Sequence, residues 1–138
     1  MKKNLFLCFI ATLFIAGISS CSKPSTPNPN AQFVGTYYGI GNFAQSGSLT
    51  PYTDTFFITA VPSSTSGIII TGTVSNPYYL TATASGGNQY YLANNQSFAG
   101  GTTLTSGTGT LTGSSLSYNY AGTTSGSAFA FIGTDAKQ

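Results

Sequence analysis

From residue 33 to the C-terminus, apolar and polar side chains alternate along the chain. A period of two is typical of β-strands, in which neighbouring side chains point to opposite faces. The segment Tyr78–Ala84 shows it most clearly, because one face carries tyrosine, leucine and alanine while the other carries tyrosine and threonine. No stretch in this part has the period of an amphipathic helix. We therefore predict an all-β domain over residues 33–138.

Clusters of Gly, Ser, Asn and Pro divide this domain into about eight short strands. The strands are predicted at Phe33–Phe43, Thr53–Val61, Ile68–Val74, Tyr78–Ala84, Gln89–Ala93, Thr102–Leu111, Leu116–Tyr120 and Ala128–Ile132. Phe98 is predicted to begin or end a further short piece within Asn94–Gly101. Gln45–Thr50 is predicted to be a loop. Ser85–Asn88 is predicted to be a hairpin turn, because its residues tolerate positive φ.

Strands that follow one another through short turns form an antiparallel up-and-down meander. A meander of this length can close into a small barrel or fold as a two-sheet sandwich. Closure removes the exposed edge strands, which a domain with so few charged residues could hardly protect. The expected architecture is therefore a small barrel, with the sandwich as the alternative.

The first residues follow a different pattern. Lys2 and Lys3 precede the apolar run Leu5–Ile18, and two serines follow it. A basic start, an apolar run and small residues are typical of a helical secretory signal peptide. The run is shorter than the roughly 20 residues that a membrane-spanning helix needs. We therefore predict a signal peptide over residues 1–20 and export of the mature chain.

The segment Ile18-Ser19-Ser20-Cys21 resembles the lipobox of bacterial lipoproteins. The resemblance implies cleavage between Ser20 and Cys21, a diacylglycerol on the Cys21 thiol and an acyl chain such as palmitate on its new amine. Several acyl chains anchor a protein firmly, since each buried methylene contributes about 0.8 kcal/mol. The alternative is an ordinary secretory signal that leaves Cys21 free.

Residues 21–32 are predicted to be the lipidated cysteine and a disordered tether. Ser22–Gln32 contains three prolines and no large apolar residue, so it cannot build a core. Ser22 directly after Cys21 resembles the outer-membrane sorting pattern of Gram-negative lipoproteins. The absence of acidic residues just after Cys21 favours the periplasmic face of the outer membrane over the cell surface.

The composition of the domain lacks most of the residue types that catalysis and metal binding use. The chain has two acidic residues, four basic residues, and neither histidine nor tryptophan. Cys8 leaves with the signal and Cys21 carries the lipid, so no thiol remains for a disulfide or a metal. Without histidine there is no usual general base and no usual zinc ligand. We therefore predict no enzymatic activity, no catalytic residues, no metal and no cofactor other than the covalent lipid.

The few charges also limit partners and sites. Binding of nucleic acid needs clustered lysine or arginine, which the domain lacks, so no nucleic-acid partner is expected. Asp54 and Asp135 are the one carboxylate pair. Asp54 is predicted to serve a turn or protect a sheet edge, and Asp135 to lie in a loose C-terminal end.

The segment Phe33-Val34-Gly35-Thr36-Tyr37-Tyr38 resembles the first-strand signature of lipocalins and fatty-acid-binding proteins, Phe-x-Gly-x-Trp. The resemblance implies a small barrel with an apolar ligand. Gly35 would allow a close backbone approach, and Tyr37 would stand where the family's tryptophan closes one end. The Thr/Gly-rich segment 107–113 resembles small Bacteroidota lipoproteins with lipocalin-like domains. The chain has no arginine to pack on the aromatic plug or to hold a fatty-acid carboxylate.

Three pairs of adjacent tyrosines stand out, at 37–38, 78–79 and 90–91. Neighbours on a strand point to opposite faces, so each pair places one ring inside and one outside. Tyr79 and Tyr91 flank the same predicted turn, and together they are the candidate binding surface for a glycan or a protein partner. The alternative is that the exposed rings serve only strand propensity and cross-strand packing.

Overall fold

The computed structural model describes residues 28–72, 77–98 and 101–138. The predicted signal peptide, Cys21 and most of the predicted tether lie outside these residues. The described part contains one short 3-10 turn and nine β-strands, and no α-helix: η1 (Ala31–Phe33), β1 (Gly35–Gln45), β2 (Ser48–Ala60), β3 (Gly67–Gly72), β4 (Tyr78–Ala84), β5 (Gln89–Leu92), β6 (Gln96–Phe98), β7 (Thr102–Thr112), β8 (Ser115–Thr124) and β9 (Ser127–Lys137).

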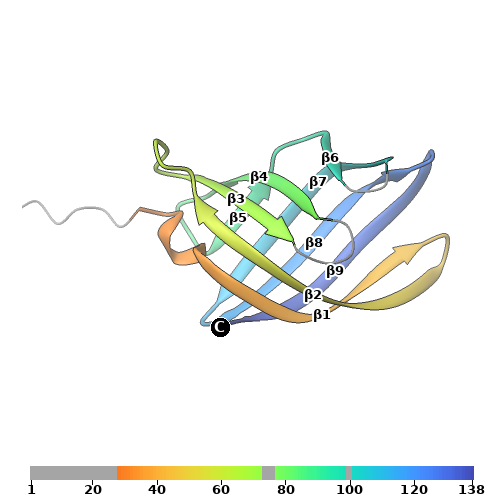
Figure 1. Ribbon diagram of the computed structural model, residues 1–138, viewed down its shortest axis with the longest axis horizontal. Helices are drawn as coiled ribbons and strands as arrows, with labels where there is room; N and C mark the ends of the chain where they lie inside the picture. The colour runs from red at the N-terminus through yellow and green to blue at the C-terminus, as the bar shows by residue number, and fades with distance from the viewer. Residues whose placement is uncertain (1–27, 73–76, 99–100) are drawn as a thin grey trace, which may run out of the picture.

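Eight of these strands form a closed antiparallel barrel (Figure 1). Each strand pairs with the next along the chain, except that β5 does not pair with β6. The first strand, β1, also pairs with the last, β9. The barrel closes where β5 pairs with β7, through Gln89–Tyr91 and Thr108–Thr110. β6 is an additional strand that pairs with a different part of β7, Thr102–Leu104. The prediction of an all-β meander barrel is confirmed, and the sandwich alternative is wrong.

Most strands lie where the alternation places them, and β4 has the predicted bounds. The predicted loop Gln45–Thr50 is wrong, because β1 and β2 continue into a tight hairpin at Ser46 and Gly47. Both turn residues have positive φ, 51° and 81°, as two-residue hairpin turns with the strand twist require. β8 and β9 also run several residues further than predicted, because their mutual pairing extends from Ser115 to Thr124.

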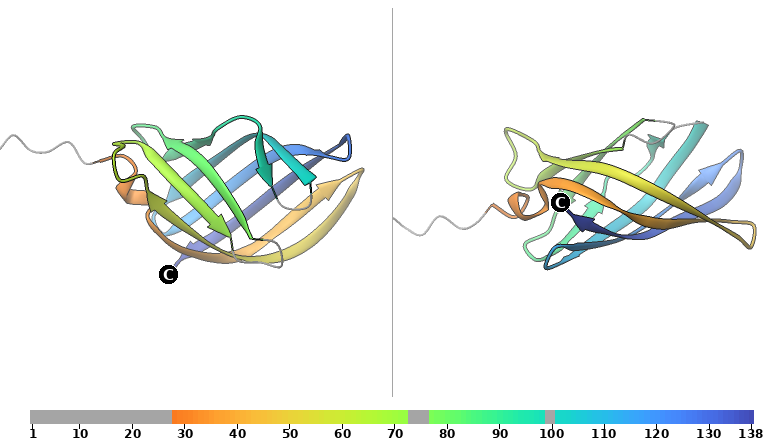
Figure 2. Two further views of the ribbon diagram at one scale, coloured as in Figure 1. Left: turned by 45° about the horizontal axis from the view of Figure 1, so that its top comes forward. Right: turned by 60° about the horizontal axis from the view of Figure 1, so that its bottom comes forward.

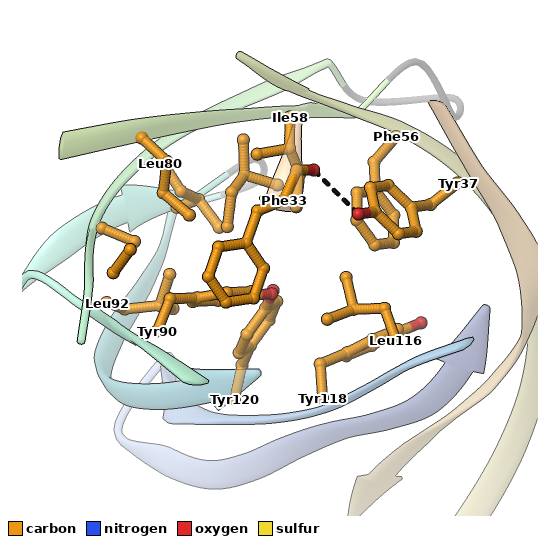
Figure 3. Packing of buried hydrophobic residues seen from close by; sticks show 14 of the residues in the cluster. Phe33, Tyr37, Phe56, Ile58, Leu80, Tyr90, Leu92, Leu116, Tyr118 and Tyr120 are labelled. Atoms are coloured by element: carbon orange, nitrogen blue, oxygen red, sulfur yellow. Dashed lines mark hydrogen bonds between the residues drawn. The ribbon is translucent and has the colours of Figure 1, made fainter. Parts of the chain in front are cut away.

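Alternate side chains of the strands fill the interior (Figure 3). Along β4 the burial alternates strictly from Tyr79 to Ala84. The fully buried large side chains include Phe33, Tyr37, Ile58, Ile68, Ile70, Leu80, Tyr90, Leu104 and Leu116. Burial of a side chain of this size stabilises the fold by about 1.5–3 kcal/mol. The core is therefore built by packing alone, as a domain without disulfides requires.

One end of the barrel is plugged by the residues that precede β1. Figure 2 shows η1 across this end, at the point where the chain enters the domain. Asn30 is 1% exposed, and its Nδ2 donates hydrogen bonds to the carbonyls of Ser64 (3.0 Å) and Gly67 (3.1 Å). Phe33 packs edge-on against the ring of Tyr90, with 5.4 Å between centroids. The last residues of the predicted tether, 28–32, are therefore part of the folded domain, and the prediction that they are disordered is wrong.

A side-chain amide bridges the barrel where β5 and β6 share the edge of β7. Gln96 Oε1 accepts a hydrogen bond from the backbone N–H of Thr81 (2.5 Å). Its Nε2 donates to the carbonyls of Thr81 (2.9 Å) and Ala93 (2.8 Å). The side-chain amide of Gln96 on β6 therefore makes the hydrogen bonds to the backbone of β4 that a neighbouring strand would make.

Candidate functional site

The two aspartates of the domain flank the same glycine inside the barrel. Gly39 on β1 pairs with Asp54 on β2 and with Asp135 on β9. Paired residues on antiparallel strands point to the same face, so both carboxyl groups point inward. Gly39 has no side chain between them, and a Cβ at this position would collide with Asp135 Oδ1. The glycine thus lets the Asp135 carboxyl group lean along the barrel wall.

The two carboxyl groups have different partners. Asp54 is 7% exposed, and its Oδ2 accepts a hydrogen bond from the Tyr78 hydroxyl at 2.8 Å. Asp135 is 1% exposed, and neither of its carboxylate oxygens has a hydrogen-bond partner. Burial raises the pKa of Asp54, and it raises the pKa of Asp135 to about 6, with the charge of Asp54 as a smaller cause. A buried carboxylate without donors is costly, so Asp135 is an unsatisfied acceptor inside the barrel.

This arrangement differs from the sequence prediction for both residues. Asp54 serves neither a turn nor a sheet edge, because it lies in the middle of β2 and faces inward. Asp135 does not lie in a loose C-terminus, because β9 continues to Lys137 between β1 and β8. The prediction failed because the last residues look like a polar tail, and only pairing with two distant strands holds them in the sheet.

Tyrosine hydroxyls line the next layer of the interior. Tyr52 Oη and Tyr118 Oη are 3.0 Å apart and share a hydrogen bond. They meet over Gly41 and Gly133, since a Cβ on either glycine would touch these hydroxyls. Burial raises the pKa of Tyr52 to about 12 and that of Tyr118 further still. The glycines thus make room for a polar layer beside the aspartates.

Other interior hydroxyls nearer the plugged end are satisfied within the protein. The Tyr37 hydroxyl donates to the carbonyl of Phe33 at 2.7 Å, which Figure 3 shows as a dashed line. The hydroxyls of Tyr90 and Tyr120 are hydrogen-bonded to each other, and burial raises the pKa of both. These hydroxyls have hydrogen-bond partners within the protein, whereas the carboxylate oxygens of Asp135 have none.

On the side away from the plug, the polar layer borders an aromatic cluster, which we define as Phe43, Tyr78, Phe98, Phe129 and Phe131. Phe131 lies at its centre, with ring centroids 5.0 Å from Phe43, 5.3 Å from Phe98 and 5.2 Å from Phe129. Tyr78 and Phe98 are 4.6 Å apart. Four of the five rings are only partly buried, Phe129 being the exception. This half of the barrel therefore presents apolar surface that the protein does not cover completely.

The residues of the predicted first-strand signature lie at the plugged end. Phe33 and Tyr37 are fully buried, and Tyr37 stacks on Phe56 with 5.3 Å between centroids. Lys137 Nζ lies 6.0 Å above the Tyr37 ring and donates a hydrogen bond to the Gln32 carbonyl at 3.0 Å. A lysine thus packs on the plug aromatic in a chain that has no arginine. Sequence reasoning missed Lys137, because no spacing rule links it to Tyr37.

The two outward tyrosines of the candidate surface are exposed, Tyr79 by 59% and Tyr91 by 48%. Across the β4–β5 pair, however, Tyr91 is opposite Thr83. Tyr79 is four positions further along β4, which corresponds to about 13 Å. The structure therefore places the rings on one face but does not bring them together.

Tyr91 borders a shallow outer groove of about 350 Å³ at the seam between β5 and β7. Its lining consists mainly of hydroxyl, amide and small side chains: Tyr91, Leu92, Asn94, Ser106, Gly107, Thr108, Asn119 and Ala121. Tyr79 does not belong to this lining. The groove is a second, separate candidate for contact with a partner.

In the residues that the structure describes, no three side chains of the His, Cys, Asp or Glu type are grouped so that they could hold a metal ion. The same residues contain no helix that is long and apolar enough to cross a membrane. No protein-family model matches this chain, and no curated protein matches its sequence.

Proposed function

We propose that this chain is a non-enzymatic, lipid-anchored protein of the cell envelope whose barrel binds a small, largely apolar ligand. The observation that carries the proposal is the incomplete burial of the aromatic cluster on the side away from the plug. Ligand sites are commonly lined by apolar and aromatic side chains with a few polar groups. The cluster with the neighbouring polar layer has this composition.

The proposed anchor and the proposed site lie toward opposite ends of the barrel. The chain enters the domain at the plugged end (Figure 2). Six residues lie between Cys21 and Asn28, so the seven Cα–Cα steps from one to the other span at most about 25 Å. An outer-membrane anchor on the periplasmic face would therefore hold the plugged end toward the membrane and leave the aromatic cluster facing away from it.

Ligand binding is tested on the mature chain, residues 21–138, with Cys21→Ser so that no attached acyl chain competes. We expect the neutral dye N-phenyl-1-naphthylamine to bind with increased fluorescence, and native mass spectrometry to detect retained small molecules after incubation with membrane lipid extract. Phe131→Ala removes the central ring of the cluster and should weaken dye binding at least tenfold. Failure of the unsubstituted barrel to bind dye or any extract component would overturn the proposal.

The matched control is Ile132→Ala, which changes the next residue of the same strand. Ile132 is 45% exposed on the outer face, so its loss should leave dye affinity unchanged. Equal losses in the two variants would show that the dye binds the outside of the barrel or only reports stability.

The anchor is tested separately in cells of a lipoprotein-processing bacterium. Metabolic labelling with an alkyne fatty acid should mark the wild-type chain and not Cys21→Ser. Protease treatment of intact cells should leave the domain whole if it lies on the periplasmic face. Loss of the domain under this treatment would instead place it on the cell surface.

A second candidate function is contact with glycans through the outer groove. The observation that favours it is the combination of an exposed ring, Tyr91, with hydroxyl and amide side chains such as Thr108 and Asn119. On a glycan array, Tyr91→Ala should abolish any signal, whereas Tyr79→Ala, outside the groove, should retain it. Equal behaviour of both variants would argue against a site in the groove.

A further inference from the structure

We infer that the ligand of the barrel carries a positively charged ammonium group, which Asp135 binds with the support of Asp54. The inference rests on the proposed ligand-binding function and specifies the chemical class of the ligand. The expected ligand is a small organic amine with an apolar body.

The carboxyl group of Asp135 is buried without hydrogen-bond donors. Its side chain is 1% exposed, leans over Gly39 into the interior, and has no hydrogen-bond partner on either carboxylate oxygen. Buried polar groups in folded proteins are nearly always hydrogen-bonded, and each exception calls for an explanation. An ammonium group offers three donors in a compact volume, which suits two free oxygens.

The two carboxyl groups of the site have no positively charged side chain beside them among the described residues. Lys137 is the one basic residue in the described part of the chain, and it lies at the plugged end against Tyr37 and the Gln32 carbonyl. Asp54 and Asp135 repel each other, and the Tyr78 hydroxyl bonded to Asp54 is neutral. The residues that the structure describes therefore supply no cation to this site, and a bound cation would relieve both the repulsion and the desolvation.

The surroundings of the two carboxyl groups suit an organic cation better than a metal ion. Calcium takes six to eight oxygen ligands, many more than the two carboxyl groups of this site supply readily. The surroundings are instead tyrosine side chains: Tyr78, a member of the aromatic cluster, donates a hydrogen bond to Asp54, and both Tyr52 and Tyr118 lie close enough to the two carboxyl groups to interact with their charge. Aromatic faces attract ammonium groups and accommodate an apolar body. The carboxyl groups thus suit the ammonium end of an arylalkylamine, and the aromatic rings suit its aryl end.

The experiment compares three probes of one skeleton on the mature chain at pH 7.5, by calorimetry and by displacement of N-phenyl-1-naphthylamine. The probes are 2-phenylethylamine, 2-phenylethanol and 3-phenylpropanoate. We expect the amine to bind at least tenfold more tightly than the alcohol and the carboxylate to bind most weakly. Asp135→Asn should reduce the amine to the affinity of the alcohol, whereas Thr134→Val, its outward neighbour, should leave the preference intact.

The outcomes separate the two proposals. Dye binding with equal amine and alcohol affinities would overturn the ammonium inference and leave the ligand-binding barrel standing. Absence of binding by dye and amine alike would overturn both. Calcium binding that is lost in Asp135→Asn, without amine binding, would show a metal site and also overturn the inference.

A second measurement covers the case in which Asp135→Asn does not fold. The groups that face Asp135 and can titrate are Asp54 and the interior tyrosines; burial raises the pKa of Tyr52 to about 12 and that of Tyr118 well above its usual range. Amine affinity of the unsubstituted barrel should therefore fall about tenfold from pH 7.5 to pH 5, as the carboxyl groups take up protons. Affinity independent of pH over this range would contradict the inference.

Discussion

At the scale of single residues, Asp135 is the side chain of the described structure whose two carboxylate oxygens are both buried without a hydrogen-bond partner. Its carboxyl group is buried without donors, and its neighbour Asp54 has the same charge. Asp54 is partly compensated by Tyr78, whereas Asp135 is not. The two residues illustrate that burial and partners decide the behaviour of a carboxyl group more than its place in the sequence does.

The burial of these carboxyl groups predicts how stability depends on pH. The pKa of Asp135 is about 6 in the folded protein and about 3.9 in an unfolded chain, and the folded pKa of Asp54 is raised as well. Between these values the folded state binds more protons than the unfolded state, so the free energy of unfolding falls as pH rises from about 4 to about 6. Urea unfolding should give a higher midpoint at pH 5 than at pH 7.5.

Asp135→Asn mimics the protonated side chain and is the matching variant. It should be more stable than the unsubstituted chain at pH 7.5 and should show a weaker change of midpoint with pH. A midpoint that rises with pH through this window would contradict the raised pKa.

At the scale of elements, the seam between β4 and β6 depends on one side chain. Gln96 joins the two strands through hydrogen bonds with the N–H and carbonyl of Thr81. Gln96→Ala leaves these groups to water, because both residues are near the surface, so we expect a loss of about 1 kcal/mol in the free energy of unfolding. Amide hydrogen exchange at Thr81 should become faster.

Gln89→Ala provides the comparison for this prediction. Gln89 lies on the adjacent strand β5, and its side chain makes only exposed contacts within or next to its own strand: Nε2 lies 3.5 Å from Thr110 Oγ1, and Oε1 accepts a hydrogen bond from the Tyr91 hydroxyl at 3.0 Å. Its replacement should change neither stability nor exchange at Thr81 by a comparable amount. Equal effects of the two substitutions would argue against a specific bridge by Gln96.

At the scale of the whole molecule, residues before the first strand complete the barrel. Asn30 links η1 to the β2–β3 turn through two hydrogen bonds to the carbonyls of Ser64 and Gly67. Asn30→Ala removes the side-chain donor to the Ser64 carbonyl and one of the two donors to the Gly67 carbonyl, which also accepts from the Val61 backbone N–H, and it should lower the free energy of unfolding by about 1–3 kcal/mol. Asn42→Ala, at an exposed position on β1, should have little effect; an equal loss would contradict the plugging role.

Sequence reasoning was most successful for local features. The alternation gave the bounds of β4 and required one tyrosine of each adjacent pair to point inward; Tyr37 and Tyr90 are buried, and Tyr38 and Tyr91 are exposed. The extent of the hairpin at Ser46 was missed, because small polar residues can form either a loop or a tight turn. For the site, Asp54 and Asp135 were recognised as the one carboxylate pair, but their position was predicted wrongly.

The sequence by itself determined strand identity and the inward or outward direction of side chains, because both follow from the two-residue period of an extended backbone. Only the tertiary structure decided which strands meet. Pairing of β1 with both β2 and β9 places Asp54 and Asp135 beside Gly39, and it places Lys137 over Tyr37. The register between strands distant along the chain depends on the packing of the whole barrel, which no local pattern encodes.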